Sequence, residues 1–117
     1  MTSPKPRWQP ISMLPTMIQL IDECLEDTLE NIGYLKSLLT FPGATYDRQT
    51  LKSFTVIFTE RLEFLPVYKE QLRRWQRLKL THPYRREVTR LREELAPLEA
   101  ALTQGLALAE ELKERIS

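Results

Sequence analysis

Mostly apolar residues recur at alternating spacings of three and four over three long stretches of this sequence, and this heptad spacing constrains the fold more than any other feature. Positions spaced in this way share one face of an α-helix. Each stretch therefore predicts one long amphipathic helix with an apolar seam. The seam positions are Leu14, Ile18, Ile21, Leu25, Thr28, Ile32, Leu35 and Leu39 in the first stretch; Leu51, Phe54, Phe58, Arg61, Leu65, Tyr68, Leu72 and Trp75 in the second; and Val88, Leu91, Leu95, Leu98, Leu102, Gly105, Ala109, Leu112 and Ile116 in the third.

Two short breaks separate these stretches. Phe41, Pro42 and Gly43 follow the first stretch, where proline cannot continue a helix and glycine accepts the left-handed turn that ends it. Pro83 falls in the first turn of the last stretch, where its missing N–H has no partner inside the helix. We therefore predict helices over residues 12–40, 47–80 and 82–116.

Short connections make consecutive helices run antiparallel. The predicted fold is all-α: an antiparallel up-down-up bundle of three long helices with coiled-coil-like heptad seams, and with Ser12 and Asp47 as N-caps of the first two. A chain of 117 residues fits a single domain. We assign residues 12–117 to the bundle and residues 1–11 to a flexible, proline-rich, basic arm.

Whole-chain composition excludes several classes of protein. Seventeen Lys and Arg against sixteen Asp and Glu leave a net charge of +1, which indicates no partner. Cys24 is the only cysteine, so there is no internal disulfide, and we expect a reducing, cytoplasmic compartment. Pro15 and Gln19 interrupt the apolar stretch near the N-terminus, so we expect neither a signal peptide nor a membrane contact.

Residues that carry catalysis or hold metals are scarce. His82 is the only histidine, so metal sites built from several imidazoles and Ser/His/Asp or Cys/His catalysis lack their components. With three glycines in all, no phosphate-cradling loop is present. We therefore predict no enzymatic activity, no cofactor and no metal.

A basic stretch spans the predicted second turn and is joined, in an up-down-up bundle, by two cations of the N-terminal arm. Arginine and aromatic side chains in one place are typical of surfaces that bind a phosphate backbone or an acidic partner. We call this set the basic pole: Lys5, Arg7, Arg73, Arg74, Arg77, Lys79, His82, Arg85, Arg86, Arg90 and Arg92. The alternative is that these arginines pair along their helices, as Glu70 with Arg74 and Glu87 with Arg90, or with the acidic run of the first helix, while Trp75 and Tyr84 pack in the core. That acidic run lies nearer the middle of the bundle, too far away to neutralise the whole pole; it consists of Asp22, Glu23, Glu26, Asp27 and Glu30.

Further apolar residues lie beside the seams of the first and third helices and widen their apolar faces. They predict a protein interface, either between copies of this chain or with a larger helical partner. The alternative is deeper burial within the monomer. These residues are Met17, Leu20, Cys24, Leu38, Leu106 and Leu108.

Arg61 breaks the seam of the second helix, and the hairpin geometry places it at the height of Thr28 and Gly105. We expect a polar layer in which Glu26, Thr28 and Gln104 surround the guanidinium. One interpretation is a recognition pocket, opened by bends at Pro66 and Pro97. The favoured one is an arginine that reaches water and fixes the register of the helices.

Two functional hypotheses follow from the sequence. The leading one is a non-enzymatic interaction or accessory protein that self-associates or docks on a larger partner. The alternative is a nucleic-acid-binding accessory protein that uses the basic pole.

Overall fold

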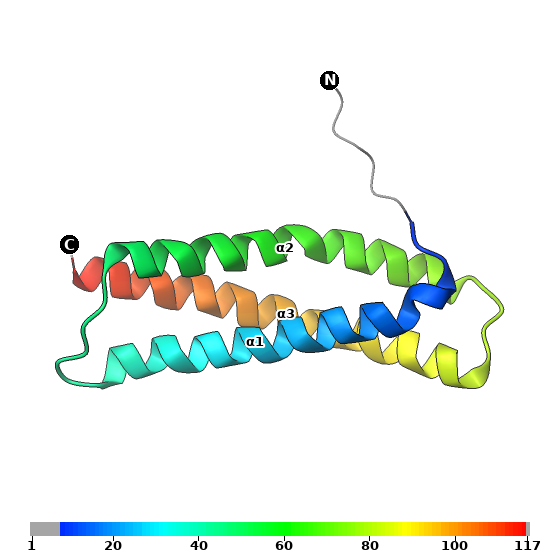
Figure 1. Cartoon of the computed structure of the whole chain (residues 1–117), viewed down its shortest axis with the longest axis horizontal. Helices are drawn as coiled ribbons and strands as arrows, with labels where there is room; N and C mark the ends of the chain where they lie inside the picture. The colour runs from blue at the N-terminus through cyan, green and yellow to red at the C-terminus, as the bar shows by residue number, and fades with distance from the viewer. Residues whose placement is uncertain (1–7, 117) are drawn as a thin grey trace, which may run out of the picture.

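A computed structural model describes residues 8–116 as an all-α bundle of three helices, in agreement with the predicted fold class. A short 3₁₀-helix, η1 (Ile11–Met13), leads into α1 (Leu14–Thr40). The helices α2 (Arg48–Gln76) and α3 (His82–Arg115) follow. Figure 1 shows α1 and α2 running in opposite directions, with the amino-terminal half of α3 crossing behind α1 and its carboxyl end behind α2.

The first two helices begin differently from one another. The carboxylate of Asp47 accepts a 2.8 Å hydrogen bond from the Thr50 N–H, so the prediction of this N-cap is confirmed. The prediction of Ser12 is wrong, because residues 11–13 wind as a 3₁₀ turn in which the Met13 N–H reaches the Pro10 carbonyl at 2.9 Å. Met13 takes the cap position instead, without a side-chain hydrogen bond.

The connections also differ in how well they were predicted. Gly43 has a φ of +80°, as expected of the left-handed residue in the first turn. The second helix ends at Gln76, four residues before the predicted end, with the Leu78 N–H bonded to the Trp75 carbonyl at 3.1 Å. This early end lets Leu80 pack against the core on the way into α3.

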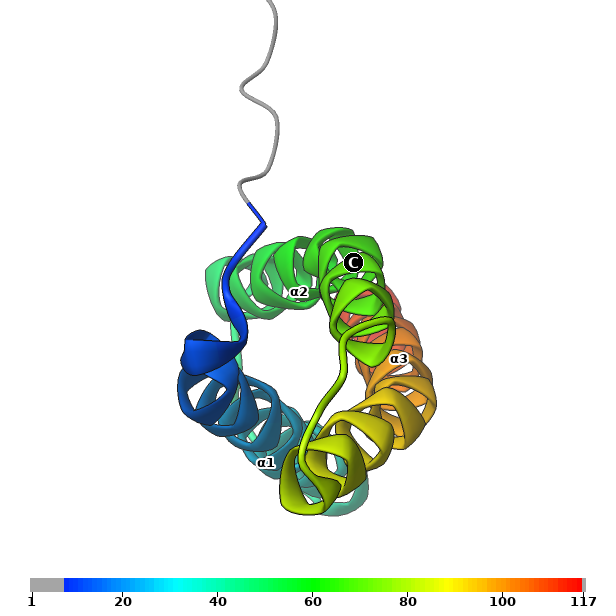
Figure 2. The ribbon, with the colours of Figure 1, turned by 90° about the vertical axis from the view of Figure 1, so that its right-hand side faces the viewer.

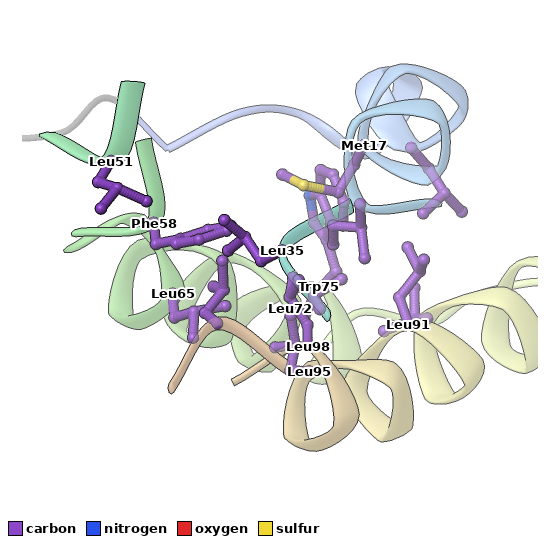
Figure 3. Close-up of a cluster of buried hydrophobic side chains, with 14 of the residues drawn as sticks. Met17, Leu35, Leu51, Phe58, Leu65, Leu72, Trp75, Leu91, Leu95 and Leu98 are labelled. Carbon is purple, nitrogen blue, oxygen red and sulfur yellow. The ribbon is translucent and has the colours of Figure 1, made fainter. Parts of the chain in front are cut away.

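The core follows the predicted seams and has α3 at its centre. α3 packs along both α1 and α2, whereas α1 and α2 make few contacts with each other; the end-on view of Figure 2 shows the arrangement. Nine residues of α3 are buried, against six each in α1 and α2. Figure 3 shows the leucines of the three helices interlocked with Phe58 and Trp75.

The seam drifts slightly at the start of α1. Met17 is buried with 9% of its surface exposed, while the predicted seam residue Ile18 is half-buried. An α-helix has 3.6 residues per turn, so its buried face shifts by about 20° per heptad relative to a 3.5-residue repeat. The prediction of Met17 as an interface residue is therefore wrong, since it belongs to the core.

No helix among residues 8–116 is both long and apolar enough to cross a lipid bilayer.

Candidate interaction surfaces

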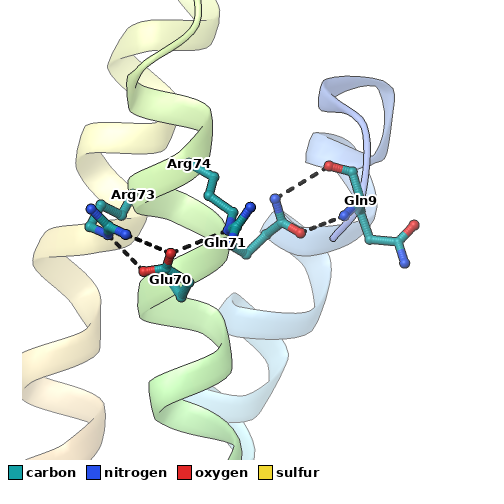
Figure 4. Close-up of polar contacts among 5 residues, drawn as sticks. All are labelled: Gln9, Glu70, Gln71, Arg73 and Arg74. Atoms are coloured by element: carbon teal, nitrogen blue, oxygen red, sulfur yellow. Dashed lines mark hydrogen bonds and ion pairs between the residues drawn. The ribbon is translucent and has the colours of Figure 1, made fainter. Parts of the chain in front are cut away.

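The segment Trp8–Pro10 is held against α2, although the sequence assigns it to a flexible arm. The Gln9 N–H donates to Oε1 of Gln71 at 2.6 Å, and Nε2 of Gln71 donates back to the Gln9 carbonyl at 3.3 Å (Figure 4). Nε1 of Trp75 donates to the same carbonyl at 2.9 Å. These bonds satisfy Gln71, which is 3% exposed, and the indole N–H of the buried Trp75. Of the arm's cations, Lys5 and Arg7 lie outside the described residues.

Two arginines of the basic pole are engaged within α2. Arg73 and Arg74 both donate to the Glu70 carboxylate, at 2.6 and 3.2 Å, which confirms the predicted pairing of Arg74 (Figure 4). The hydrogen bond from Arg73 lowers the pKa of Glu70. The Arg74 guanidinium also lies 4.3 Å from the centre of the Trp8 ring.

Arg90 is surrounded by three carboxylates. It lies 2.9 Å from Glu87, as predicted, 2.8 Å from Glu94 and 3.1 Å from Asp22 of α1. The bond from Arg90 lowers the pKa of Asp22, whereas burial raises the pKa of Glu94, whose Oε2 is buried without a hydrogen-bond partner among residues 8–116. Arg90 thus ties α3 to α1. Arg92, another cation of the basic pole, donates a hydrogen bond to Oε1 of Gln76.

Four cations of the basic pole remain exposed and make neither an ion pair nor a side-chain hydrogen bond within the described part of the chain. We call them the turn cluster: Arg77, Lys79, Arg85 and Arg86. A shallow depression lies beside two of them and is lined by His82, Arg85, Arg86, Thr89, Arg90 and Glu93.

Tyr84 lies beside the turn cluster and is 43% exposed, so the interpretation that it packs in the core is wrong. The first buried residue of α3 is Val88, which means that the first turn of this helix extends beyond the core. Trp75, in contrast, is buried as expected.

A second exposed surface is formed by apolar side chains of α1 and α2. Leu20 (47%) and Tyr34 (48%) are exposed on α1, and Phe64 (55%) and Ile57 (36%) on α2. The rings of Tyr34 and Phe54 meet across the two helices at 5.8 Å between centroids. We call this surface the α1–α2 face.

The predicted interface residues are divided between this face and the interior. Only Leu20 is exposed, whereas Cys24, Leu38, Leu106 and Leu108 are half-buried and pack against the core. Burial raises the pKa of the Cys24 thiol. Tyr34, Ile57 and Phe64 were not predicted to be interface residues, because none of them lies on an apolar seam. Each does lie three or four residues from another exposed side chain of its helix, and this spacing places it on the same face as that side chain.

The polar layer is present only in part. Nη1 of Arg61 donates to Oγ1 of Thr28 at 2.9 Å, which bridges α2 and α1. Glu26 and Gln104 are exposed, and neither is hydrogen-bonded to Arg61 in residues 8–116, so their predicted roles are wrong. Glu26 instead borders a depression with Asp22 and Leu29 on the side of α1 that faces α3.

Gly105 completes this level of the bundle. A Cβ at this position would lie 2.7 Å from Cε2 of Phe58, so the glycine makes room for the buried ring.

The described residues contain no group of three or more His, Cys, Asp and Glu side chains able to hold a metal ion. Comparison with protein-family models, curated proteins and solved structures found no match to this chain.

Proposed function

We propose that this chain is an interaction protein whose α1–α2 face binds an amphipathic helix of a partner protein. The observation that carries the proposal is the row of exposed apolar side chains, Leu20, Tyr34, Ile57 and Phe64, on two helices that make few contacts with each other. Exposed apolar groups gathered in one place are typical of binding surfaces. A helix laid against both α1 and α2 would complete a four-helix arrangement and cover them.

Helix geometry defines the edges of this face. Leu20, Glu23, Asp27, Glu30 and Tyr34 follow one another at spacings of three and four, so they form one stripe along α1. The corresponding stripe of α2 contains Ile57, Glu60 and Phe64. All eight side chains are exposed.

Four of these eight residues are acidic, so the charge of the face selects its partner. A helix with lysine or arginine beside an apolar stripe would pair with Glu23, Asp27, Glu30 and Glu60 while its apolar residues cover the exposed ones. Two copies of this chain meeting through the same face would instead bring acidic stripes together. We therefore favour a basic partner helix over self-association. The half-buried Cys24, with no second cysteine to pair with, supports a cytoplasmic setting.

A designed peptide tests the proposal. The probe is a labelled helix of about 18 residues, roughly five turns, made of leucine on one face and lysine on the other. Fluorescence anisotropy should detect binding to the purified chain. A scrambled peptide of the same composition has the same charge but no apolar stripe and should bind at least about tenfold more weakly.

Two leucines of α1 provide matched variants, since Leu20 and Leu29 are exposed to similar extents, 47% and 54%, on different sides of the helix. Leu20→Gln, alone and with Phe64→Gln, should weaken peptide binding about tenfold, whereas Leu29→Gln should leave it within about twofold. Equal effects of the two leucine variants would overturn the proposal. So would a dimer in light scattering that Phe64→Gln dissociates, since the face would then be a contact between copies.

A further inference from the structure

The turn cluster stands apart from the rest of the basic pole because folding does not explain it. Arg73, Arg74 and Arg90 are held by carboxylates, and Arg92 by Gln76. The four residues of the turn cluster are exposed, and none has an ion pair among residues 8–116. They are a concentration of positive charge available to a ligand.

The positions of these arginines in their helices strengthen this distinction. Arg73 and Arg74 lie in the last turn of α2, where the helix dipole stabilises cations. Arg85 and Arg86 lie at the beginning of α3, which has no acidic residue in its first turn and no side-chain cap from Thr81. Cations there are repelled by the positive end of the helix dipole. The placement of Arg85 in the first turn of α3 therefore opposes folding, which is typical of a residue retained for binding, whereas Arg77 at the C-cap of α2 is favourably placed.

The chemistry around the cluster indicates the class of ligand. Three of its four members are arginines, whose planar guanidinium groups match phosphate oxygens in geometry as well as charge. Tyr84 lies beside them in sequence and exposes 43% of its surface, so its ring is free to stack on a base. Bases are available for stacking in single strands and not inside a duplex.

We propose that the turn cluster binds the phosphate backbone of single-stranded nucleic acid and that Tyr84 stacks on one of its bases. This site is separate from the α1–α2 face, so each proposal can fail without the other. The nucleic acid is recognised through charge and stacking, which predicts little dependence on base sequence.

Arg85→Gln/Arg86→Gln is the central variant. Binding of a labelled single-stranded oligonucleotide of mixed sequence is followed by fluorescence anisotropy between about 50 and 200 mM salt. The variant should lose at least about tenfold in affinity, and its plot of log affinity against log salt should flatten by about 1.4, since each phosphate contact of a single strand contributes about 0.7. Its thermal unfolding midpoint should not fall, because neither side chain makes an ion pair or a side-chain hydrogen bond among residues 8–116.

The other end of the bundle supplies a charge-matched control. Lys52 and Lys113 line a depression between α2 and α3 with Arg48 and Glu110, far from the turn cluster (Figure 1). Lys52→Gln/Lys113→Gln removes the same charge and should leave affinity within about twofold. Tyr84→Ala should weaken binding of the single strand several-fold without changing the salt slope or the binding of the matching duplex.

Three results would overturn the proposal. The first is an equal loss of affinity in the Arg85/Arg86 and Lys52/Lys113 variants, which would mean a non-specific charge effect. The second is equal binding of single strand and duplex that is insensitive to Tyr84→Ala. The third is binding to vesicles of phosphatidylcholine and phosphatidylserine without binding to the oligonucleotide, which would make a membrane surface the ligand. If the double variant unfolds at a lower temperature, the single variants Arg85→Gln and Arg86→Gln replace it. Each should flatten the plot of log affinity against log salt by half as much, and the same three results would overturn the proposal.

Discussion

At the scale of single residues, the contact between Gly105 and Phe58 decides how closely α3 approaches α2. Phe58 is fully buried, and a Cβ at Gly105 would lie only 2.7 and 2.9 Å from Cε2 and Cζ of its ring. The glycine is therefore needed for space and not for backbone conformation.

Gly105→Ala should destabilise the chain by up to about 2 kcal/mol in urea unfolding. Displacing a packed ring costs about 1–3 kcal/mol, which outweighs the gain of about 1 kcal/mol when alanine replaces glycine in a helix. In a chain that already carries Phe58→Leu, Gly105→Ala should lower the free energy of unfolding by less than it does in the parent. A more stable Gly105→Ala variant would mean that the ring moves freely.

The carboxylates around Arg90 predict a pH dependence with two opposite signs. Asp22 has a lowered pKa, so its stabilising effect is present above its unfolded value of about 3.9 and is lost as pH falls through the folded value. Glu94 has a raised pKa, so its contribution is present below its unfolded value of about 4.3 and is lost as pH rises through the folded value.

Urea midpoints measured from pH 2.5 to 7 should separate the two groups. Asp22→Asn should be less stable than the parent near neutral pH by less than about 1 kcal/mol, and the difference should shrink as the pH falls below about 4. Glu94→Gln should gain stability relative to the parent as pH rises above about 4.3. Parallel profiles for all three proteins would contradict this prediction, because they would mean that the pKa values of Asp22 and Glu94 do not change on unfolding.

At the scale of helices, the bond from Arg61 to Thr28 is a specific link between two elements that otherwise touch little. Thr28 is fully buried and Arg61 is half-buried. Thr28→Val should therefore cost about 1–2 kcal/mol, because it removes the acceptor while leaving the guanidinium partly desolvated.

A double-mutant cycle with Arg61→Met tests this link. The double variant should be more stable than the sum of the single effects predicts, by about 1 kcal/mol, since replacing both partners leaves no polar group without a bond. Additive effects would mean that water replaces the lost hydroxyl.

The helices and their seams could be predicted from sequence because both follow from local spacing. The same holds for Glu70 with Arg74 and Glu87 with Arg90, which are three or four residues apart. Contacts between elements depend on the rotation of each helix, which heptad spacing leaves undetermined by tens of degrees.

This limit explains why the prediction of Thr28 beside Arg61 is confirmed and that of Glu26 is wrong. Thr28 lies on the side of α1 that faces α2, whereas Glu26 lies on the side that faces α3. The same limit explains why pairing with the acidic run of α1 could be expected in general but not assigned to Asp22 and Arg90, and why Gln9 was not matched with Gln71. The turn cluster is defined by the absence of such partners among residues 8–116, which sequence spacing alone does not indicate.

At the scale of the whole molecule, stability should be concentrated in α3. It packs against both other helices and has the largest number of buried residues. Opening α1 or α2 alone breaks one helix–helix interface, whereas exposing the middle of α3 requires breaking both.

Native-state hydrogen exchange should therefore find the slowest amides in α3, between Leu91 and Leu112, with exchange free energies near the global value. Amides at the centres of α1 and α2 should exchange through smaller openings. Equal protection of all three helices would indicate that the bundle opens only as a unit.

Because the described part of the chain crosses the bundle an odd number of times, Trp8 and the end of α3 lie at opposite poles, as Figure 1 shows. A fluorophore attached at Trp8 would lie beside Arg74, at the pole that holds the second turn. One attached at the end of α3 would lie the length of this helix away, about 50 Å for its 34 residues. The choice of attachment point thus determines whether the label leaves the basic pole accessible or obstructs it.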